Sequence, residues 1–141
     1  MRVGLMFIHC VLLSLSLGSG TVLASEHLDA ATKGLSTTEV FAFGGVGYAG
    51  VISRGEVDFK ILLSQSSSDA LAAFETLYAT GNPQAKAYAL SGIKKLNPGR
   101  FKVLLASPST KDQVKVMRGC IVSRESLHDV AAQIDQHKFR F

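Results

Sequence analysis

The sequence places one nucleophile close to one base, Cys120 and His128. Cys120 follows a glycine in an apolar stretch, just before a helix that we predict to begin near Ser123, and His128 lies on that helix. A catalytic thiol needs a base or a helix N-terminus that stabilises the thiolate. The arrangement therefore indicates a thiol-dependent enzyme or redox protein that uses Cys120. A buried core cysteine and a disulfide with a second chain are the alternatives.

A group of basic and aromatic residues indicates binding instead. Lys94 and Lys95 end one predicted helix, and Arg100 follows at the start of the next. The helix dipole favours cations near a helix C-terminus, so the two lysines also have a structural reason to be there. The functional interpretation is a face for an anionic envelope lipid, an acidic polysaccharide or an acidic protein. With Tyr78 and Tyr88, these cations make up the binding face that the sequence predicts.

A glycine-rich stretch, GVGYAG at residues 45–50, matches the loop of dinucleotide-binding sites. Such a loop must pass directly into a helix, but the next helix is predicted to begin only after Ser53, which caps it. No nucleotide cofactor is therefore expected. The glycines are instead expected to bend the backbone while Tyr48 and Val51 pack.

Metal and acid–base sites have little support. His27, His128 and His137 are not placed to converge, so no metal site is expected. Glu56 is expected to close the cap of its own helix, and Asp58 to face water. Without an apolar pocket to raise the pKa of one carboxylate, this pattern is typical of a charged surface.

The first residues have the order of a secretory signal peptide. A single charge at Arg2 precedes an apolar run over residues 3–17, and small residues then lead to Ala24. The run is shorter than the roughly 20 residues of a membrane-spanning helix, although an uncleaved anchor is the alternative. Residues 1–24 are therefore expected to be removed before Ser25. The mature protein is expected to be secreted or periplasmic, without a transmembrane segment.

Composition narrows the remaining classes. The formal net charge is +4, and the basic residues are dispersed rather than gathered in runs of five or six like charges. The sequence has no tryptophan and no basic strand with interleaved aromatic residues, so no nucleic-acid partner is expected. After removal of the signal peptide, Cys120 has no internal partner, and packing must hold the fold.

Short helices dominate the predicted fold, which is mainly α. Residues 25–52 are predicted to form a flexible N-terminal and glycine-rich segment, with 39–43 extended or strand-like. Residues 53–141 are predicted to form a helical domain whose tail, from 137, is frayed or lightly docked. Periodicity and capping residues predict four to five helices and a short β segment: helices at 54–64, 69–79, 83–96, 98–106 and from Ser123 or Ser126 to 136, and β structure near 113–122.

The stretch LYATGNPQAKAYALSGIKKLNP resembles a helical hairpin of the HEAT type, in which two helices stack side by side across a short turn with proline. The resemblance covers residues 69–97. Gly81, expected in a left-handed conformation, and Asn82 form a two-residue link, so the helices should be antiparallel neighbours. The small residues of the second helix should permit a close approach. Repeat folds need about three units, and a compact helical domain is the alternative.

The function predicted from these features is that of a small exported helical protein that acts by binding. Its expected partner is a protein or an anionic envelope component, and no cofactor or catalysis is expected. The thiol-dependent enzyme that uses Cys120 is the alternative from a different class, and a purely structural envelope component is a third.

Overall fold

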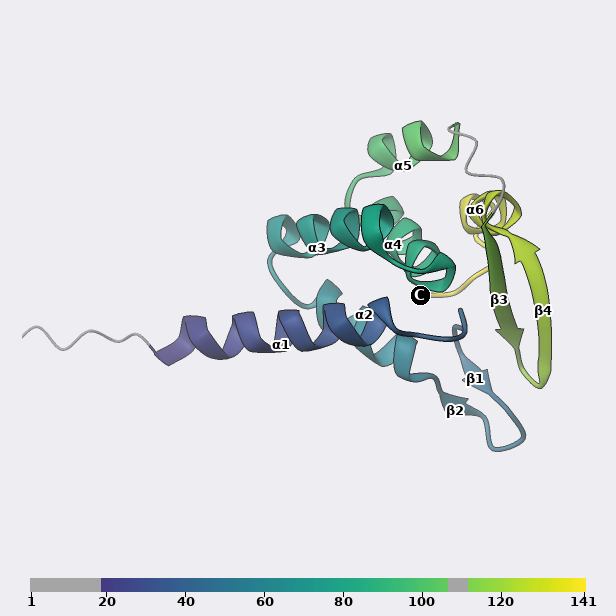
Figure 1. Cartoon of the computed structure of the whole chain (residues 1–141), viewed down its shortest axis with the longest axis horizontal. Coiled ribbons are helices and arrows are strands. Elements are labelled where there is room, and N and C mark those ends of the chain that lie inside the picture. The colour runs from purple at the N-terminus through teal and green to yellow at the C-terminus, as the bar shows by residue number, and fades with distance from the viewer. Residues whose placement is uncertain (1–18, 107–111) are drawn as a thin grey trace, which may run out of the picture.

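The computed structural model describes residues 19–106 and 112–141, so residues 1–18 of the expected signal peptide lie outside the described part. The described part is mainly α, with six helices and two short antiparallel hairpins (Figure 1). The predicted fold class is confirmed. The elements are α1 (Ser19–Ser36), β1 (Gly45–Val46), β2 (Val51–Ile52), α2 (Arg54–Leu63), α3 (Ser67–Thr80), α4 (Pro83–Leu96), α5 (Pro98–Leu105), β3 (Gln113–Arg118), β4 (Ile121–Ser126) and α6 (Leu127–Asp135). None of the described helices is both long enough and apolar enough to cross a membrane.

Polar caps set where the helices begin. Before each of α2 to α6 stands a serine or asparagine whose side chain accepts a backbone N–H of the first turn. These N–H groups have no partner within their helix, so the cap satisfies them. Pro83 occupies the first turn of α4, where its missing N–H costs nothing. The caps are Ser53, Ser66, Asn82, Asn97 and Ser126.

Helices α3 and α4 form the centre of the fold and lie side by side (Figure 1). A Cβ atom added at Gly92 of α4 would lie 2.6 Å from Cζ of Phe74 on α3, so the missing side chain allows the close approach that the small residues predict. Gly81 in the link has a φ of −74°, so the expectation of a left-handed residue there is wrong. A side chain at Gly81 would instead meet the Cβ of Ala85 at 2.7 Å.

Residues 25–36 belong to α1, where the sequence analysis assigned no helix. Ala31 and Leu35 are buried against the neighbouring helices, and α1 contacts α2, α3 and α4. The described part therefore has one helix more than the largest predicted number. Besides Ala31 and Leu35, the apolar residues of 25–36 are Leu28 and the small Ala30, so the apolar stripe is too sparse for periodicity to reveal. The helix also runs through the expected cleavage position before Ser25.

The two hairpins lie next to each other at one end of the molecule, and their turns point the same way (Figure 1). Strands β3 and β4 are joined by Gly119 and Cys120, and Gly119 has the positive φ of 57° that a tight two-residue turn favours. The N–H of Gly47, in the β1–β2 turn, donates to the carbonyl of Gly119 at 2.9 Å. Phe41 forms a parallel β-bridge with Val116, on the edge of β3 that does not pair with β4. Residues 39–43 thus contribute an extended segment.

The C-terminal tail is docked by alternate residues. Phe139 is buried and its ring lies 4.9 Å from the ring of Phe41. Phe141 also packs against the core. Lys138, which precedes Phe139, and Arg140, which lies between the two phenylalanines, are exposed. This period of two is that of an extended chain with one face on the core. The tail therefore presents two cations to solvent instead of fraying.

Candidate binding site

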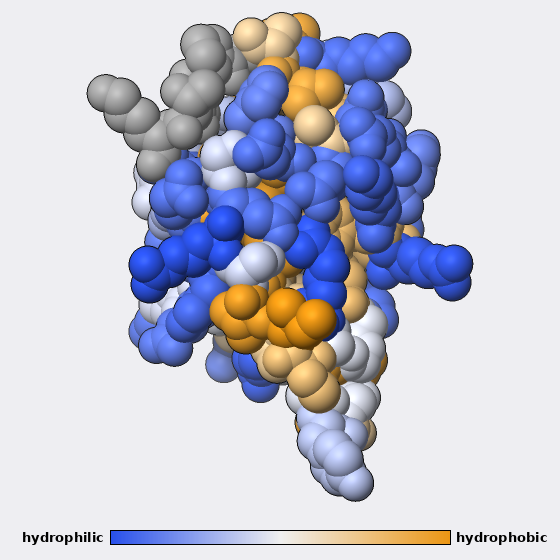
Figure 2. All heavy atoms as spheres, turned by 90° about the vertical axis from the view of Figure 1, so that its right-hand side faces the viewer, coloured by the Kyte–Doolittle hydropathy of each residue, from blue (hydrophilic) through white to orange (hydrophobic). Residues whose placement is uncertain are grey.

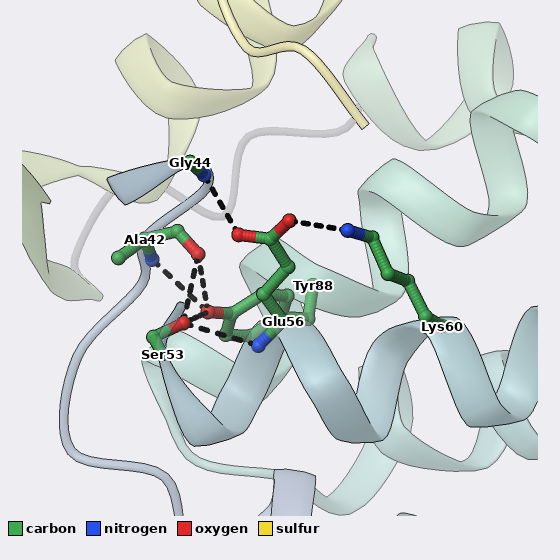
Figure 3. A network of polar contacts seen from close by, with 6 residues as sticks. All are labelled: Ala42, Gly44, Ser53, Glu56, Lys60 and Tyr88. Atoms are coloured by element: carbon green, nitrogen blue, oxygen red, sulfur yellow. Dashed lines mark hydrogen bonds and ion pairs between the residues drawn. The ribbon is translucent and has the colours of Figure 1, made fainter. Parts of the chain in front are cut away.

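Tyr88, a residue of the predicted binding face, is fully buried and holds a polar network together (Figure 3). Its hydroxyl donates to the carbonyl of Ala42 at 2.7 Å and accepts from the N–H of Ala42 at 3.0 Å. The hydroxyl of Ser53 lies 3.3 Å away. Burial raises the pKa of the Tyr88 phenol, which therefore stays protonated at neutral pH and remains a donor. Tyr88 is a core residue, which corrects its assignment to a binding face.

The two carboxylates of α2 are structural as well. Glu56 is buried, accepts from the N–H of Gly44 at 2.7 Å and pairs with Lys60 at 2.7 Å (Figure 3). Asp58 is fully buried and accepts from Arg54 Nε at 3.0 Å, so the expectation that it faces water is wrong. Buried charges need such partners. The carboxylate of Glu56 fixes the backbone that leads into β1.

The predicted basic group does not assemble into a free surface. Lys94 Nζ donates to the carbonyls of Ile134 and Asp135 at 2.6 and 2.8 Å, and so closes the C-terminus of α6. Arg100 donates through two nitrogens to Glu75 at 2.9 and 3.1 Å, and these hydrogen bonds raise its pKa. Lys95 remains exposed.

Two further predicted site residues, Tyr78 and His128, line the same small gap between helices. Its volume of about 10 Å³ is at the limit for one water molecule, so it does not accommodate a ligand. Tyr78 is half-buried there.

The thiol arrangement is not supported by the geometry. Cys120 lies exposed in the β3–β4 turn, whereas His128 follows the far end of β4. Six extended residues separate the two ends of β4, which is roughly 20 Å. His128 therefore cannot act as the base for Cys120. In the described ranges no group of histidine, cysteine and acidic residues could hold a metal ion.

Four exposed cations are called the basic face below: Lys115 and Arg124 on the β3–β4 hairpin, and Lys138 and Arg140 on the C-terminal tail beside the turn of that hairpin. Lys115 and Arg124 stand directly opposite each other across β3 and β4. Within the described residues none of the four takes part in an ion pair. Like charges directly opposite destabilise a strand pair, so an anion bound here would stabilise the hairpin.

The basic face borders two depressions. Lys115 and Arg124 line one of about 630 Å³ whose other walls are all polar: Thr38, Glu39, Asn82, Gln84 and Gln113. Lys138 and Arg140 line the second, of about 270 Å³, beside the β3–β4 turn. Glu39 is the acidic residue in these walls. The polar depression at Lys115 and Arg124 suits oxygen-rich anions, whereas the depression at Lys138 and Arg140 also has apolar walls, formed by Phe43, Met117 and Phe139.

Exposed apolar side chains gather on the same two hairpins and are called the apolar tips below: Tyr48, Val51, Ile52, Ile121 and Val122. Figure 2 views the β3–β4 side and shows an apolar patch with strongly hydrophilic side chains beside it. Tyr48 is 104% exposed and Val51 61% exposed, so the expectation that they pack is wrong. The β1–β2 turn projects beyond the core, and no core surface is left for them to cover.

Sequence reasoning missed the basic face, although two local signals pointed to it. The alternation in QVKVMR puts Lys115 on the face opposite the buried Val114 and Val116. The alternation in KFRF does the same for the two cations of the tail. The partner of Lys115 could not be read, because it depends on the register of the hairpin.

Glu125 anchors the hairpin and makes its stability depend on pH. Hydrogen bonds from Arg118, helped by Ser123 and Gln133, lower the pKa of Glu125 from 4.5 to about 2. A folded-state pKa below the unfolded one stabilises the protein above pH 4.5, and that contribution is lost as the pH falls towards 2. We expect Glu125→Gln to be less stable at neutral pH and to lose less stability over this range. Urea unfolding at stepped pH measures this, and equal slopes for variant and parent would contradict it.

Comparison with known protein families, with curated proteins and with solved structures finds no match for this chain. The resemblance of residues 69–97 to a HEAT-type hairpin stays a prediction.

Proposed function

We propose that this chain is an exported protein that acts by binding an anionic component of the cell envelope, and that the basic face makes the contact. The observation that carries the proposal is the pair Lys115 and Arg124, two exposed cations held side by side on neighbouring strands with no ion-pair partner among the described residues. Holding two like charges together costs stability. A bound anion offsets that cost, whereas a purely structural hairpin gains nothing from the pair.

The distribution of the other cations supports this choice of surface. On the helices, Lys60, Lys86, Lys94 and Arg100 are each neutralised by an acidic side chain. Three further exposed lysines have no ion pair among the described residues, but each lies on a different helix: Lys33, Lys95 and Lys102. We therefore place the contact on the basic face, and not on the face around Lys94 and Arg100 that the sequence predicts.

Export rests on the signal-like order of residues 1–24. Cleavage before Ser25 would leave residues 25–36 of α1, with Ala31 and Leu35 still in the core. The mature chain therefore keeps the contacts that hold α1 against α2 and α3. The mass of the protein recovered from the periplasm or the medium tests this proposal, and a chain that retains residues 1–24 contradicts it.

The binding proposal predicts a charge effect confined to the hairpin. We expect Lys115→Glu with Arg124→Glu to reduce retention of the protein on isolated envelopes by more than about tenfold, because each cation near an anionic surface contributes roughly fivefold. Added salt should weaken the parent's retention. The measurement is the fraction bound after sedimentation.

Lys95→Glu with Lys102→Glu is the matched control, since it changes the net charge equally at two exposed lysines on α4 and α5. We expect this variant to be retained nearly as well as the parent. Circular dichroism checks that both variants stay helical. If both double variants lose retention equally, net charge is responsible and the basic face is not the site.

A further inference from the structure

We infer that the anionic component is the lipid surface of a membrane, and that the apolar tips insert between its headgroups while the basic face contacts them. This inference rests on the proposed function and adds the chemical class of the partner. A lipid surface is the one envelope component that offers negative charge and an apolar layer together. The hairpin end presents the complementary pair of features.

The exposed apolar side chains lie where a flat surface can reach them. Tyr48 is 104% exposed, Ile121 73% and Val122 50%, and all three lie at or beside the two turns. Because the turns point the same way (Figure 1), a flat surface can meet both hairpins at once. Exposed apolar residues that gather in this way mark an interaction site rather than ordinary scatter. A tyrosine suits the boundary of a membrane, where its ring is apolar and its hydroxyl is hydrated.

Apolar and basic residues form two layers along the β3–β4 hairpin, with the apolar residues nearer the turn. Lys115 and Arg124 lie three residue pairs from the turn, which is about 10 Å along the strands. The headgroup region on each side of a bilayer is roughly 5–7 Å thick. With the tips at the level where the acyl chains begin, these long side chains reach the phosphate groups. Lys138 and Arg140 line the depression that includes Gly119 of the turn, and so lie nearer the surface.

Neighbouring acidic residues neutralise little of the positive charge of the basic face. Glu125 is already held by Arg118 and Gln133, on the face of the hairpin that carries Val114. Glu39 lies in the wall of the polar depression, without an ion pair among the described residues. Four cations of the basic face therefore act against one unpaired acid in these walls.

The turns of the two hairpins are joined to each other by a hydrogen bond. The turn at Gly119 joins the strands through two residues, and the hydrogen bond from Gly47 fixes one turn against the other. The apolar tips are thus held in place before the protein meets a membrane, so binding loses little conformational entropy.

Vesicle binding tests the inference directly. The exported protein is mixed with vesicles of phosphatidylcholine alone or of equal parts phosphatidylcholine and phosphatidylglycerol. We expect binding to the anionic vesicles only. Ile121→Ser with Val122→Ser should weaken that binding by about tenfold or more, because two apolar side chains no longer leave water. Val57→Ser with Val103→Ser is the control, since both valines are exposed on helices, α2 and α5, and not on the hairpins.

A single fluorophore reports insertion itself. The sequence has no tryptophan, so Tyr48→Trp places the only indole at the β1–β2 turn. We expect its emission to shift to shorter wavelength on anionic vesicles and to be quenched by lipids brominated on their acyl chains. Binding without shift or quenching would overturn insertion of the tips.

The outcomes separate this inference from the function on which it rests. If envelopes retain the protein through Lys115 and Arg124 but anionic vesicles do not bind it, the proposed function stands and the lipid inference fails. The component is then an acidic polysaccharide or protein. If neither envelopes nor vesicles respond to charge reversal of this pair, both proposals fail.

Discussion

Replacing Tyr88 with phenylalanine is expected to lower the free energy of unfolding by about 2–3 kcal/mol, because a buried donor loses its partner. The hydroxyl accepts from the N–H of Ala42 and donates to the carbonyl of the same residue. Ser53 still reaches that carbonyl at 3.2 Å, but the part of the chain that the structure describes offers the N–H no substitute acceptor. Urea unfolding followed by circular dichroism measures the loss.

Tyr78→Phe is the matched control for this prediction. Tyr78 is only half-buried, and its hydroxyl makes no hydrogen bond within the described residues, so the change should stay within about 0.5 kcal/mol. A similar loss in both variants would mean that the tyrosine ring, rather than the network of Figure 3, determines the effect.

Replacing Gly92 with alanine is expected to lower the free energy of unfolding by about 2 kcal/mol, although alanine favours helices over glycine by about 1 kcal/mol. A Cβ atom there would lie 2.6 Å from Cζ of Phe74, whose ring is fully buried and cannot swing into solvent. The centroid of the Phe59 ring lies 5.5 Å from the centroid of the Phe74 ring. Helices α3 and α4 must therefore move apart, and the core loosens around them.

Gly99→Ala in α5 is the control with the opposite sign. The nearest atom to a Cβ there is Oδ1 of Asn97 at 3.6 Å, an ordinary contact distance. We expect this variant to gain about 0.5 kcal/mol from the lower entropy of its unfolded chain. Thermal unfolding of both variants gives the comparison. If Gly92→Ala is as stable as Gly99→Ala, the close approach of α3 and α4 does not limit the fold.

The core and the proposed binding surface are linked through one short segment. Ala42 and Gly44 are held by the hydroxyl of Tyr88 and the carboxylate of Glu56, and the chain passes directly from them into β1. Phe41, just before them, bridges to β3. The position of both hairpins thus depends on buried polar contacts.

Local features of the sequence determined much of the helical structure. Two of the capping residues, Ser53 and Ser126, were identified or narrowed to a choice of two, and the helices they begin are confirmed, because a cap and its first turn involve neighbouring residues. Pro83 and the two-residue link placed α3 beside α4 for the same reason. The strands near 113–122 were predicted from alternation, but β4 extends beyond that range to Ser126.

Tertiary structure alone decided which side chains are free to bind. Tyr88 is buried by a partner 46 residues away, Lys94 is taken up by a carbonyl 40 residues away, and Arg100 by an acid 25 residues away. The same distant packing leaves the basic face exposed and unpaired. Periodicity and capping report contacts within a few residues, whereas the neutralisation of a charge depends on whichever group the fold brings near it. The sequence therefore determined the helices and their turns, and the fold determined the surface on which they can act.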